Sequence, residues 1–310
     1  MTSYARQTKD IKGVFLEKLK QIQSFRWLDS ILLLLVAIVW GTSYGVAKNA
    51  VLYYPVLGFI ALRFCITSII FLPIVFSSTK KSITTTIKAG LPLGFVLLLI
   101  FVSETYGLSK TSAANSAFLI SLYVVFTPFI QWLLLKETPN RKTLIAAFMS
   151  IIGTFLLSYQ HDQSLQLNLG DYLILLAAVL RATMVTLTKK LTQDQEVNMM
   201  LLTTVQTSVV GIGCLILGLV IYPQQIIILP AIGEFWLNLI YLVIFCTMFA
   251  FFVQNFSVKR TSPTKVALLM GSEPVWGALY ATLVMHESLS LTAWVGGLLI
   301  VLAMLWTTIK

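Results

Sequence analysis

The sequence predicts an all-α integral membrane protein, with ten transmembrane helices arranged as two inverted five-helix repeats and both termini in the cytoplasm. Long apolar windows, an uneven distribution of Lys and Arg, and an internal repeat support this prediction. The 310-residue chain is 57% hydrophobic and only 11% charged, with a mean hydropathy of +0.87. A soluble domain carries about 25% charged residues. This apolar excess indicates that most of the chain is solvated by lipid.

The first 27 residues form a basic segment that precedes the first apolar window. The segment lacks the apolar core and the small-residue cleavage site of a signal peptide, so we expect a cytoplasmic N-terminal segment over residues 1–27. Its apolar residues recur at helical spacing (Ile11, Val14, Phe15, Leu19 and Ile22). This spacing favours a short helix on an anionic membrane surface, and a disordered basic tail is the alternative.

Ten apolar windows of about 20 residues follow, each long enough to cross the hydrocarbon core as a helix. Helices are favoured over strands because every backbone N–H in hydrocarbon must be bonded within its own segment. The first five windows form a repeat over residues 28–159, and the last five form a repeat over residues 170–310. In order, the predicted spans are 30–48, 53–76, 88–108, 112–135, 141–159, 170–189, 198–221, 234–256, 264–285 and 290–308.

The basic residues orient these spans. With a cytoplasmic N-terminus, 18 of the 22 Lys and Arg residues fall in inside segments. Only Lys48 and Lys110 fall outside, and Arg63 and Arg181 lie within spans. This is a strong positive-inside bias. It accounts for the net charge of +10 without a nucleic-acid partner.

The chain matches itself when it is shifted by 150 residues. Thr111–Ser112 then falls on Thr261–Ser262, and Glu137 falls on Glu287. Because five predicted helices separate equivalent positions, the two halves cross the membrane in opposite directions. Inverted repeats are typical of carriers in which one half moves against the other around a midplane site.

Three segments together resemble the EamA-type repeat of the drug/metabolite transporter superfamily. They are VWGTSYGVAK (Val39–Lys48), GLSKTSAANSAFLISLYVVFTPFIQWLLLKE (Gly107–Glu137) and SVKRTSPTKVALLMGSEPVWGALYATLVMHE (Ser257–Glu287). The resemblance implies a central cavity lined by helices 1 to 4 and 6 to 9, with helices 5 and 10 at the periphery. It also implies transport, because the family includes exporters of amino acids, drugs and other metabolites alongside some importers. The chain departs from the family at Arg181, where Trp is common, and at Glu104, where the position is usually uncharged.

Four charged residues within the spans are the main candidates for substrate binding: Arg63, Arg181, Glu104 and Glu273. A charge at the bilayer centre costs about 2.5–3.5 kcal/mol, so these side chains must face a wet cavity or one another. In the functional interpretation, the two arginines bind a carboxylate or phosphate, and a glutamate receives an ammonium group or a proton. The alternative is two Arg–Glu pairs that only join the halves.

Uncharged residues in the same helices complete the predicted substrate site. The polar candidates are Asn115, Gln206, Gln254 and Asn255, for which hydrogen bonding between helices is an equal alternative. The aromatic candidates are Trp40, Tyr44 and Trp276, for which a position facing lipid is the alternative. Gly41 and Gly45 have the spacing of a close helix contact. Pro128 and Pro274 are expected to bend the fourth and ninth helices.

Enzymatic motifs are missing from the sequence. Its histidines, His161 and His286, fall in outside segments, and it contains neither HExxH nor GxxxxGK[ST]. The three cysteines lie in apolar windows, which favours a packing role. We therefore expect no catalytic residue, metal or cofactor.

The sequence thus favours a secondary transporter of small polar metabolites in the bacterial inner membrane, exporting amino acids or related zwitterions. An importer of a larger, nucleotide-like charged metabolite is one alternative, and a non-transporting membrane partner subunit is another. The expected partners are a small-molecule substrate and the lipid bilayer. Proton coupling through Glu273 and a homodimer are left open.

Overall fold

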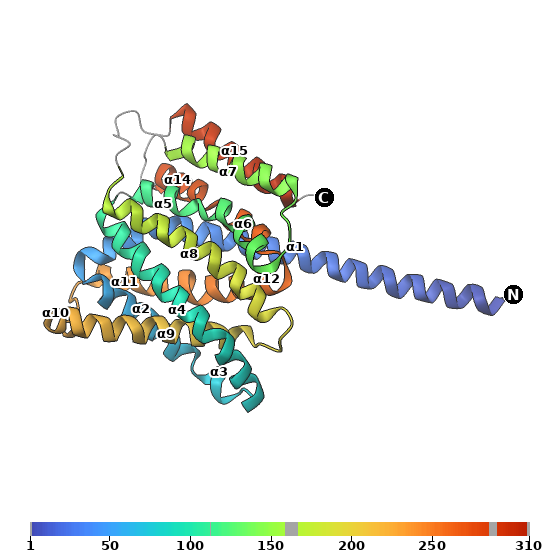
Figure 1. Ribbon diagram of the computed structural model, residues 1–310, viewed down its shortest axis with the longest axis horizontal. Coiled ribbons are helices and arrows are strands. Elements are labelled where there is room, and N and C mark those ends of the chain that lie inside the picture. The colour runs from blue at the N-terminus through green and yellow to red at the C-terminus, as the bar shows by residue number, and fades with distance from the viewer. Residues whose placement is uncertain (1, 112, 159–166, 285–289, 309–310) are drawn as a thin grey trace.

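The computed structural model describes residues 2–111, 113–158, 167–284 and 290–308. Side chains are described within these ranges except at residues 2–26, 113–115, 158, 281, 284, 307 and 308. All regular structure in these ranges is helical. The helices lie roughly along one direction and form a bundle, from which the N-terminal part of α1 projects (Figure 1).

The two halves of the chain contain similar successions of helices. The first half comprises α1 (Thr2–Tyr53), α2 (Val56–Phe71), α3 (Pro73–Phe76), α4 (Lys80–Lys110), α5 (Ala113–Ser121), α6 (Tyr123–Leu135) and α7 (Arg141–Ser158). The second half comprises α8 (Leu169–Thr192), α9 (Met199–Ile221), α10 (Pro223–Ile227), α11 (Gly233–Tyr241), the π-helix η1 (Leu242–Phe249), α12 (Ala250–Arg260), α13 (Pro263–Met270), α14 (Glu273–Val284) and α15 (Leu291–Thr308).

Seven helical segments among the described residues are long and apolar enough to cross a membrane. They are Trp27–Tyr53, Val56–Phe76, Lys80–Lys110, Ser116–Leu135, Leu169–Thr192, Met199–Ile221 and Gly233–Arg260. Leu291–Trp306 is apolar but shorter. The chain is therefore a multi-pass membrane protein by length and composition, as the hydropathy predicted.

Helix α1 is longer than the sequence suggested. It runs from Thr2 to Tyr53 without a break, so residues 11–22 belong to the same helix as the first apolar window. The prediction of a separate short helix is therefore wrong, and so is the alternative of a disordered tail. Between residues 14 and 54 the sequence contains no Pro and no Gly other than Gly41 and Gly45, so no helix-breaking residue lies between the basic segment and the first apolar window.

The fourth and ninth predicted spans are each divided into two helices at equivalent positions. Leu122 separates α5 from α6, and Gly271 and Ser272 separate α13 from α14. A shift of 150 residues places Leu122 on Ser272. A proline lacks the N–H that would bond the carbonyl four residues earlier. For Pro274 that carbonyl belongs to Met270, at the end of α13, so this proline accounts for the break before α14. Pro128 lies inside α6, and its missing bond falls at Val124 and does not explain the break at Leu122.

Helices α7 and α15 lie side by side at one edge of the bundle (Figure 1). They cross at glycines: a Cβ atom on Gly153 would lie 2.6 Å from the carbonyl oxygen of Gly296. Only residues without a side chain allow the two backbones to approach this closely. This is the peripheral pair that the family resemblance implied, and the remaining helices surround the centre of the bundle.

Candidate substrate-binding site

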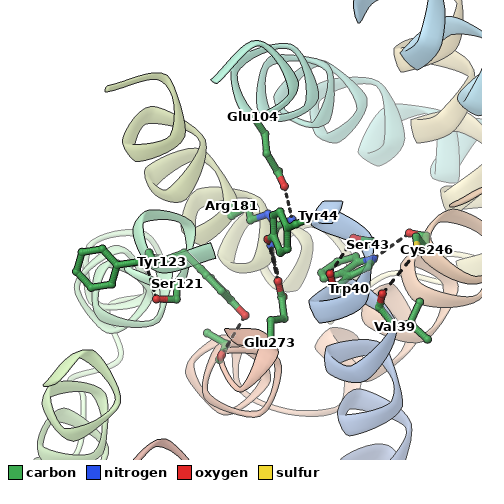
Figure 2. A network of polar contacts seen from close by, with 12 residues as sticks. Val39, Trp40, Ser43, Tyr44, Glu104, Ser121, Tyr123, Arg181, Cys246 and Glu273 are labelled. Atoms are coloured by element: carbon green, nitrogen blue, oxygen red, sulfur yellow. Dashed lines mark hydrogen bonds and ion pairs between the residues drawn. The ribbon is translucent and has the colours of Figure 1, made fainter. Parts of the chain in front are cut away.

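Arg181 of α8 lies at the centre of a cluster of charged residues. Its Nη2 donates a hydrogen bond to Glu104 Oε1 of α4 at 3.1 Å, and its Nη1 lies 3.5 Å from both carboxylate oxygens of Glu273 of α14 (Figure 2). All three side chains are largely buried. One guanidinium therefore joins two carboxylates from helices that are far apart in the sequence.

Aromatic rings enclose this cluster and are themselves held by hydrogen bonds. The Arg181 guanidinium lies 4.9 Å from the centre of the Trp40 ring, within the range of a cation–π interaction. Trp40 Nε1 donates to the carbonyl oxygen of Cys246 at 2.9 Å, and the Tyr44 hydroxyl donates to Glu273 Oε2 at 3.1 Å. These bonds fix the orientation of both rings on α1.

Gly41 brings α1 close enough to α14 for these contacts. A Cβ atom there would collide with the carbonyl oxygen of Glu273 and lie 3.0 Å from the backbone nitrogen of Gly277. Gly45 has no other atom near its Cβ position. Of the two glycines in the predicted contact pattern, only Gly41 therefore makes a close helix contact.

A narrow cavity of ≈ 20 Å³ adjoins Arg181. This volume accommodates about one water molecule. Its wall is apolar and aromatic except at Arg181 and Gln254, and it includes Trp40, Phe101, Tyr123 and Phe251. A space of this size is too small for a metabolite.

The two repeats contribute equivalent positions to this centre but different side chains. A shift of 150 residues places Glu104 on Gln254 and Tyr123 on Glu273. The Tyr123 ring centre lies 6.0 Å from the Arg181 guanidinium, and its hydroxyl donates to the carbonyl oxygen of Ala267. The backbone arrangement is thus repeated while the side chains differ. At each of these two equivalent positions, one repeat carries a carboxylate and the other an uncharged side chain.

Arg63 of α2 has a different environment from Arg181. Its Nε donates to the hydroxyl of Thr247 at 2.7 Å, and its guanidinium lies 5.2 Å from the Phe101 ring and 5.5 Å from the Phe64 ring. The residue is 6% exposed. The alternative prediction of two separate Arg–Glu pairs is therefore wrong, because one arginine joins both glutamates and the other is bonded to a threonine.

Thr247 is a residue that the sequence analysis missed. It lies in the π-helix η1, where its hydroxyl also donates to the carbonyl oxygen of Leu242, five residues earlier. Single-turn π segments are often found at functional sites. A π-helix is a local change in hydrogen-bond register, and no residue type in this apolar segment signals it.

The remaining predicted residues separate into two groups. Gln254 lines the cavity. Asn255 Nδ2 donates to Gln206 Oε1 at 2.7 Å and to Thr203 Oγ1 at 3.0 Å, which joins α12 to α9. Gln206 and Asn255 therefore make the interhelical contacts that were the alternative prediction for them.

Trp276 and Asn115 stand apart from the cluster. Trp276 Nε1 donates to the hydroxyl of Ser272, four residues earlier in the chain, at 3.2 Å. The Trp276 side chain is not part of the cavity wall. Asn115 belongs to α5, and its side chain lies outside the described residues.

The central cluster contains more acidic than basic groups. With both carboxylates ionised, Arg181, Glu104 and Glu273 together have one excess negative charge. Arg63, whose guanidinium stacks on Phe101 three residues before Glu104, supplies a second buried cation beside the cluster, so two arginines and two carboxylates balance when all four are ionised. Glu104 Oε2 is buried and has no hydrogen-bond partner among the described residues.

These features define a multi-pass membrane protein with a charged, enclosed centre, the architecture of a solute transporter. The chain belongs to the EamA-like transporter family, whose model matches residues 28–159 and 168–309. This confirms the resemblance found in the sequence.

Two relatives are described as transporters. The chain is 26% identical over 278 residues to an uncharacterized transporter of Archaeoglobus fulgidus, covering 90% of this chain and 85% of that protein. It is 23% identical over 253 residues to the uncharacterized transporter YyaM of Bacillus subtilis, covering 79% of this chain and 82% of that protein. One solved crystal structure superposes with a TM-score of 0.74 at 15% identity, covering 91% of this chain and 98% of that one. At this identity the likeness concerns the fold alone.

Proposed function

We propose that the protein is a secondary transporter that exports amino acids or related zwitterions across the bacterial inner membrane by alternating access. The supporting observation is the placement of Arg181 between Glu104 and Glu273 at the centre of the bundle. Intramembrane charges of this kind mark substrate or ion pathways. Glu104 Oε2 has no partner among the described residues and can accept from the ammonium group of a zwitterion, and either carboxylate can take up a proton.

The proposed topology has ten spans with both termini in the cytoplasm. Beyond the seven long segments, α7, the pair α13–α14, and α15 are the other three spans. Contacts between distant helix ends agree with this topology, because they join ends that it places on the same side. Asn49 and Tyr53 both donate to Glu234 on the outer side, and Lys189 donates to the carbonyl oxygen of Lys259 on the inner side.

At the outer end, three helices meet in a group that we call the outer node. Lys48 Nζ of α1 donates to the carbonyl oxygen of Thr111 at 2.8 Å, and the Thr111 hydroxyl donates to Asp171 Oδ1 of α8 at 2.6 Å. Thr111 directly follows α4. The outer node therefore joins α1 and α8 through the end of α4.

At the inner end, an equivalent group forms what we call the inner node. Lys189 Nζ of α8 donates to the carbonyl oxygen of Lys259 at 2.9 Å, and Arg260 Nε lies 3.5 Å from Asp29 Oδ2 of α1. Lys259 and Arg260 end α12. The inner node joins α8 and α1 through the end of α12, with the roles of the two repeats exchanged. This arrangement supports alternating access, in which one node opens while the other stays closed.

Weakening the two nodes should change the accessibility of the centre in opposite directions. We expect Thr111→Val to increase labelling of a cysteine placed at Gln254 by an impermeant thiol reagent added outside, by about fivefold for a loss of ~1 kcal/mol. Asp29→Asn should decrease this labelling and increase labelling in inverted vesicles. The background has Cys65, Cys214 and Cys246 replaced by alanine.

The matched control for the nodes is Lys81→Gln. Lys81 and Glu196 form an ion pair at 3.6 Å whose side chains are 85% and 91% exposed, so its loss should leave labelling unchanged. If both node variants shift labelling in the same direction, the two nodes are not alternating gates.

The export function itself is tested in cells that overproduce the protein. We expect one or more amino acids or closely related zwitterions to accumulate in the medium, detected by mass spectrometry. A variant with both Glu104→Gln and Glu273→Gln removes the negative charge and should abolish the accumulation at equal membrane abundance. If the wild-type protein changes only anionic metabolites such as nucleotides, the importer alternative is correct. If no metabolite changes, the partner-subunit alternative is favoured.

A further inference from the structure

Arg63 has unused hydrogen-bonding capacity in a buried location. A guanidinium has five N–H donors, and the one on Nε is bonded to Thr247. No hydrogen bond joins either terminal nitrogen to another residue in the described part of the chain. Stacking over the rings of Phe64 and Phe101 stabilises the cation but satisfies none of these N–H groups.

Arg63 as a whole is 6% exposed, but its terminal nitrogens are not among the fully buried polar atoms that lack a partner, so they keep accessible surface through which a ligand can reach them. Arg63 also differs from Arg181, whose two terminal nitrogens are both used by carboxylates. Of the two intramembrane arginines, Arg63 is therefore the one whose planar fork is available to a bidentate anion.

A free acceptor lies on the helix against which Arg63 stacks. Glu104 Oε1 is bonded to Arg181, but Glu104 Oε2 is buried without a partner among the described residues. Phe101, on which the Arg63 guanidinium stacks, is three residues before Glu104 on α4. Residues at this spacing are neighbours on one helix face, about 5–6 Å apart at Cβ. Arg63 and Glu104 thus approach the same face of α4 one turn apart.

We propose that Arg63 and Glu104 together bind the α-amino acid group of the substrate, with its carboxylate on the terminal nitrogens of Arg63 and its ammonium on Glu104 Oε2. In an amino acid these two groups are separated by a single carbon atom, which suits a donor and an acceptor one helical turn apart. Phe101 stacks with Arg63 and also lines the cavity beside Arg181, which holds about one water molecule and must widen before a substrate side chain can enter it. This proposal rests on the proposed export of zwitterions, and it gives Arg181 the separate role of holding Glu104 in position.

The test measures ligand binding to the purified full chain in detergent, by the shift of its thermal unfolding midpoint. The probes are the proteinogenic L-amino acids, followed by the amide and the N-acetyl derivative of the amino acid that binds best. The amide lacks the carboxylate, and the N-acetyl derivative lacks the ammonium. We expect Arg63→Gln to weaken binding of the amino acid about 10- to 100-fold while leaving the weak binding of the amide unchanged.

Glu104→Gln should give the complementary pattern. It should weaken binding of the amino acid while leaving binding of the N-acetyl derivative unchanged. Arg63→Lys keeps the charge but loses the fork, so it should bind with intermediate affinity and serves as the informative variant if Arg63→Gln does not fold. Arg141→Gln makes the same chemical change on the exposed surface and should bind like the wild type.

The proposal is overturned if no amino acid stabilises the wild-type protein, or if Arg63→Gln binds the amino acid with unchanged affinity. These results are distinct from a failure of the export function. An amino acid that binds through Arg63 but does not accumulate outside cells would refute export and leave the binding site intact. Export that continues unchanged in Arg63→Gln would refute the binding site and leave export intact.

Discussion

Replacement of Arg181 by alanine is expected to reduce the stability and membrane abundance of the protein severely. The substitution removes the single cation that joins Glu104 and Glu273, and leaves two buried carboxylates without it. Breaking a buried pair in this way typically costs about 3–5 kcal/mol. The measurements are membrane abundance by fluorescence-detected size-exclusion chromatography and the midpoint of thermal unfolding.

Neutralising one carboxylate should restore part of this loss. In the double variant Arg181→Ala with Glu104→Gln, only Glu273 remains charged, and it keeps the hydrogen bond from Tyr44. We therefore expect a positive coupling between the two changes in a double-mutant cycle. Arg181→Lys retains the charge but has no planar fork with which to reach two carboxylates. Its stability and membrane abundance should therefore lie between those of the wild type and of Arg181→Ala. Normal abundance and normal transport of Arg181→Ala would contradict a linking role for this arginine.

Replacement of Glu273 by glutamine is expected to abolish transport driven by a pH gradient while substrate exchange continues. Glu273 is 2% exposed and lies directly before Pro274, where the ninth span begins its second helix. A carboxyl group alternates between a protonated and an ionised form, and an amide does not. The amide still accepts the hydrogen bond from Tyr44, so the local structure should persist.

The two activities are separated in proteoliposomes. Uptake against an imposed pH gradient reports coupling, and counterflow of labelled substrate without a gradient reports binding and movement. Glu234→Gln, which makes the same change at the outer surface beside Asn49 and Tyr53, is the control and should retain both activities. Gradient-driven transport by Glu273→Gln at the wild-type rate would remove Glu273 from proton coupling.

The membrane character of this protein and the identity of its intramembrane charges were predictable from sequence. Hydropathy is a sum over neighbouring residues, so it can be evaluated without knowing any contact. Arg63, Glu104, Arg181 and Glu273 stand out because a charge in an apolar window is costly wherever the helix points. The family resemblance likewise follows from local segments, and the family model confirms it.

The pairing of these charges depended on the tertiary structure. Which carboxylate meets Arg181 depends on the rotation and crossing of α4, α8 and α14, and Gly41 controls how closely α1 approaches α14. These are long-range relations that no local window contains. Thr247, which accepts the hydrogen bond from Arg63, lies in the π-helix η1, whose register is a backbone property that no residue type in this segment signals. The same limit explains why Gln206 and Asn255, indistinguishable in sequence from ligand-binding amides, are bonded to each other once their helices are packed.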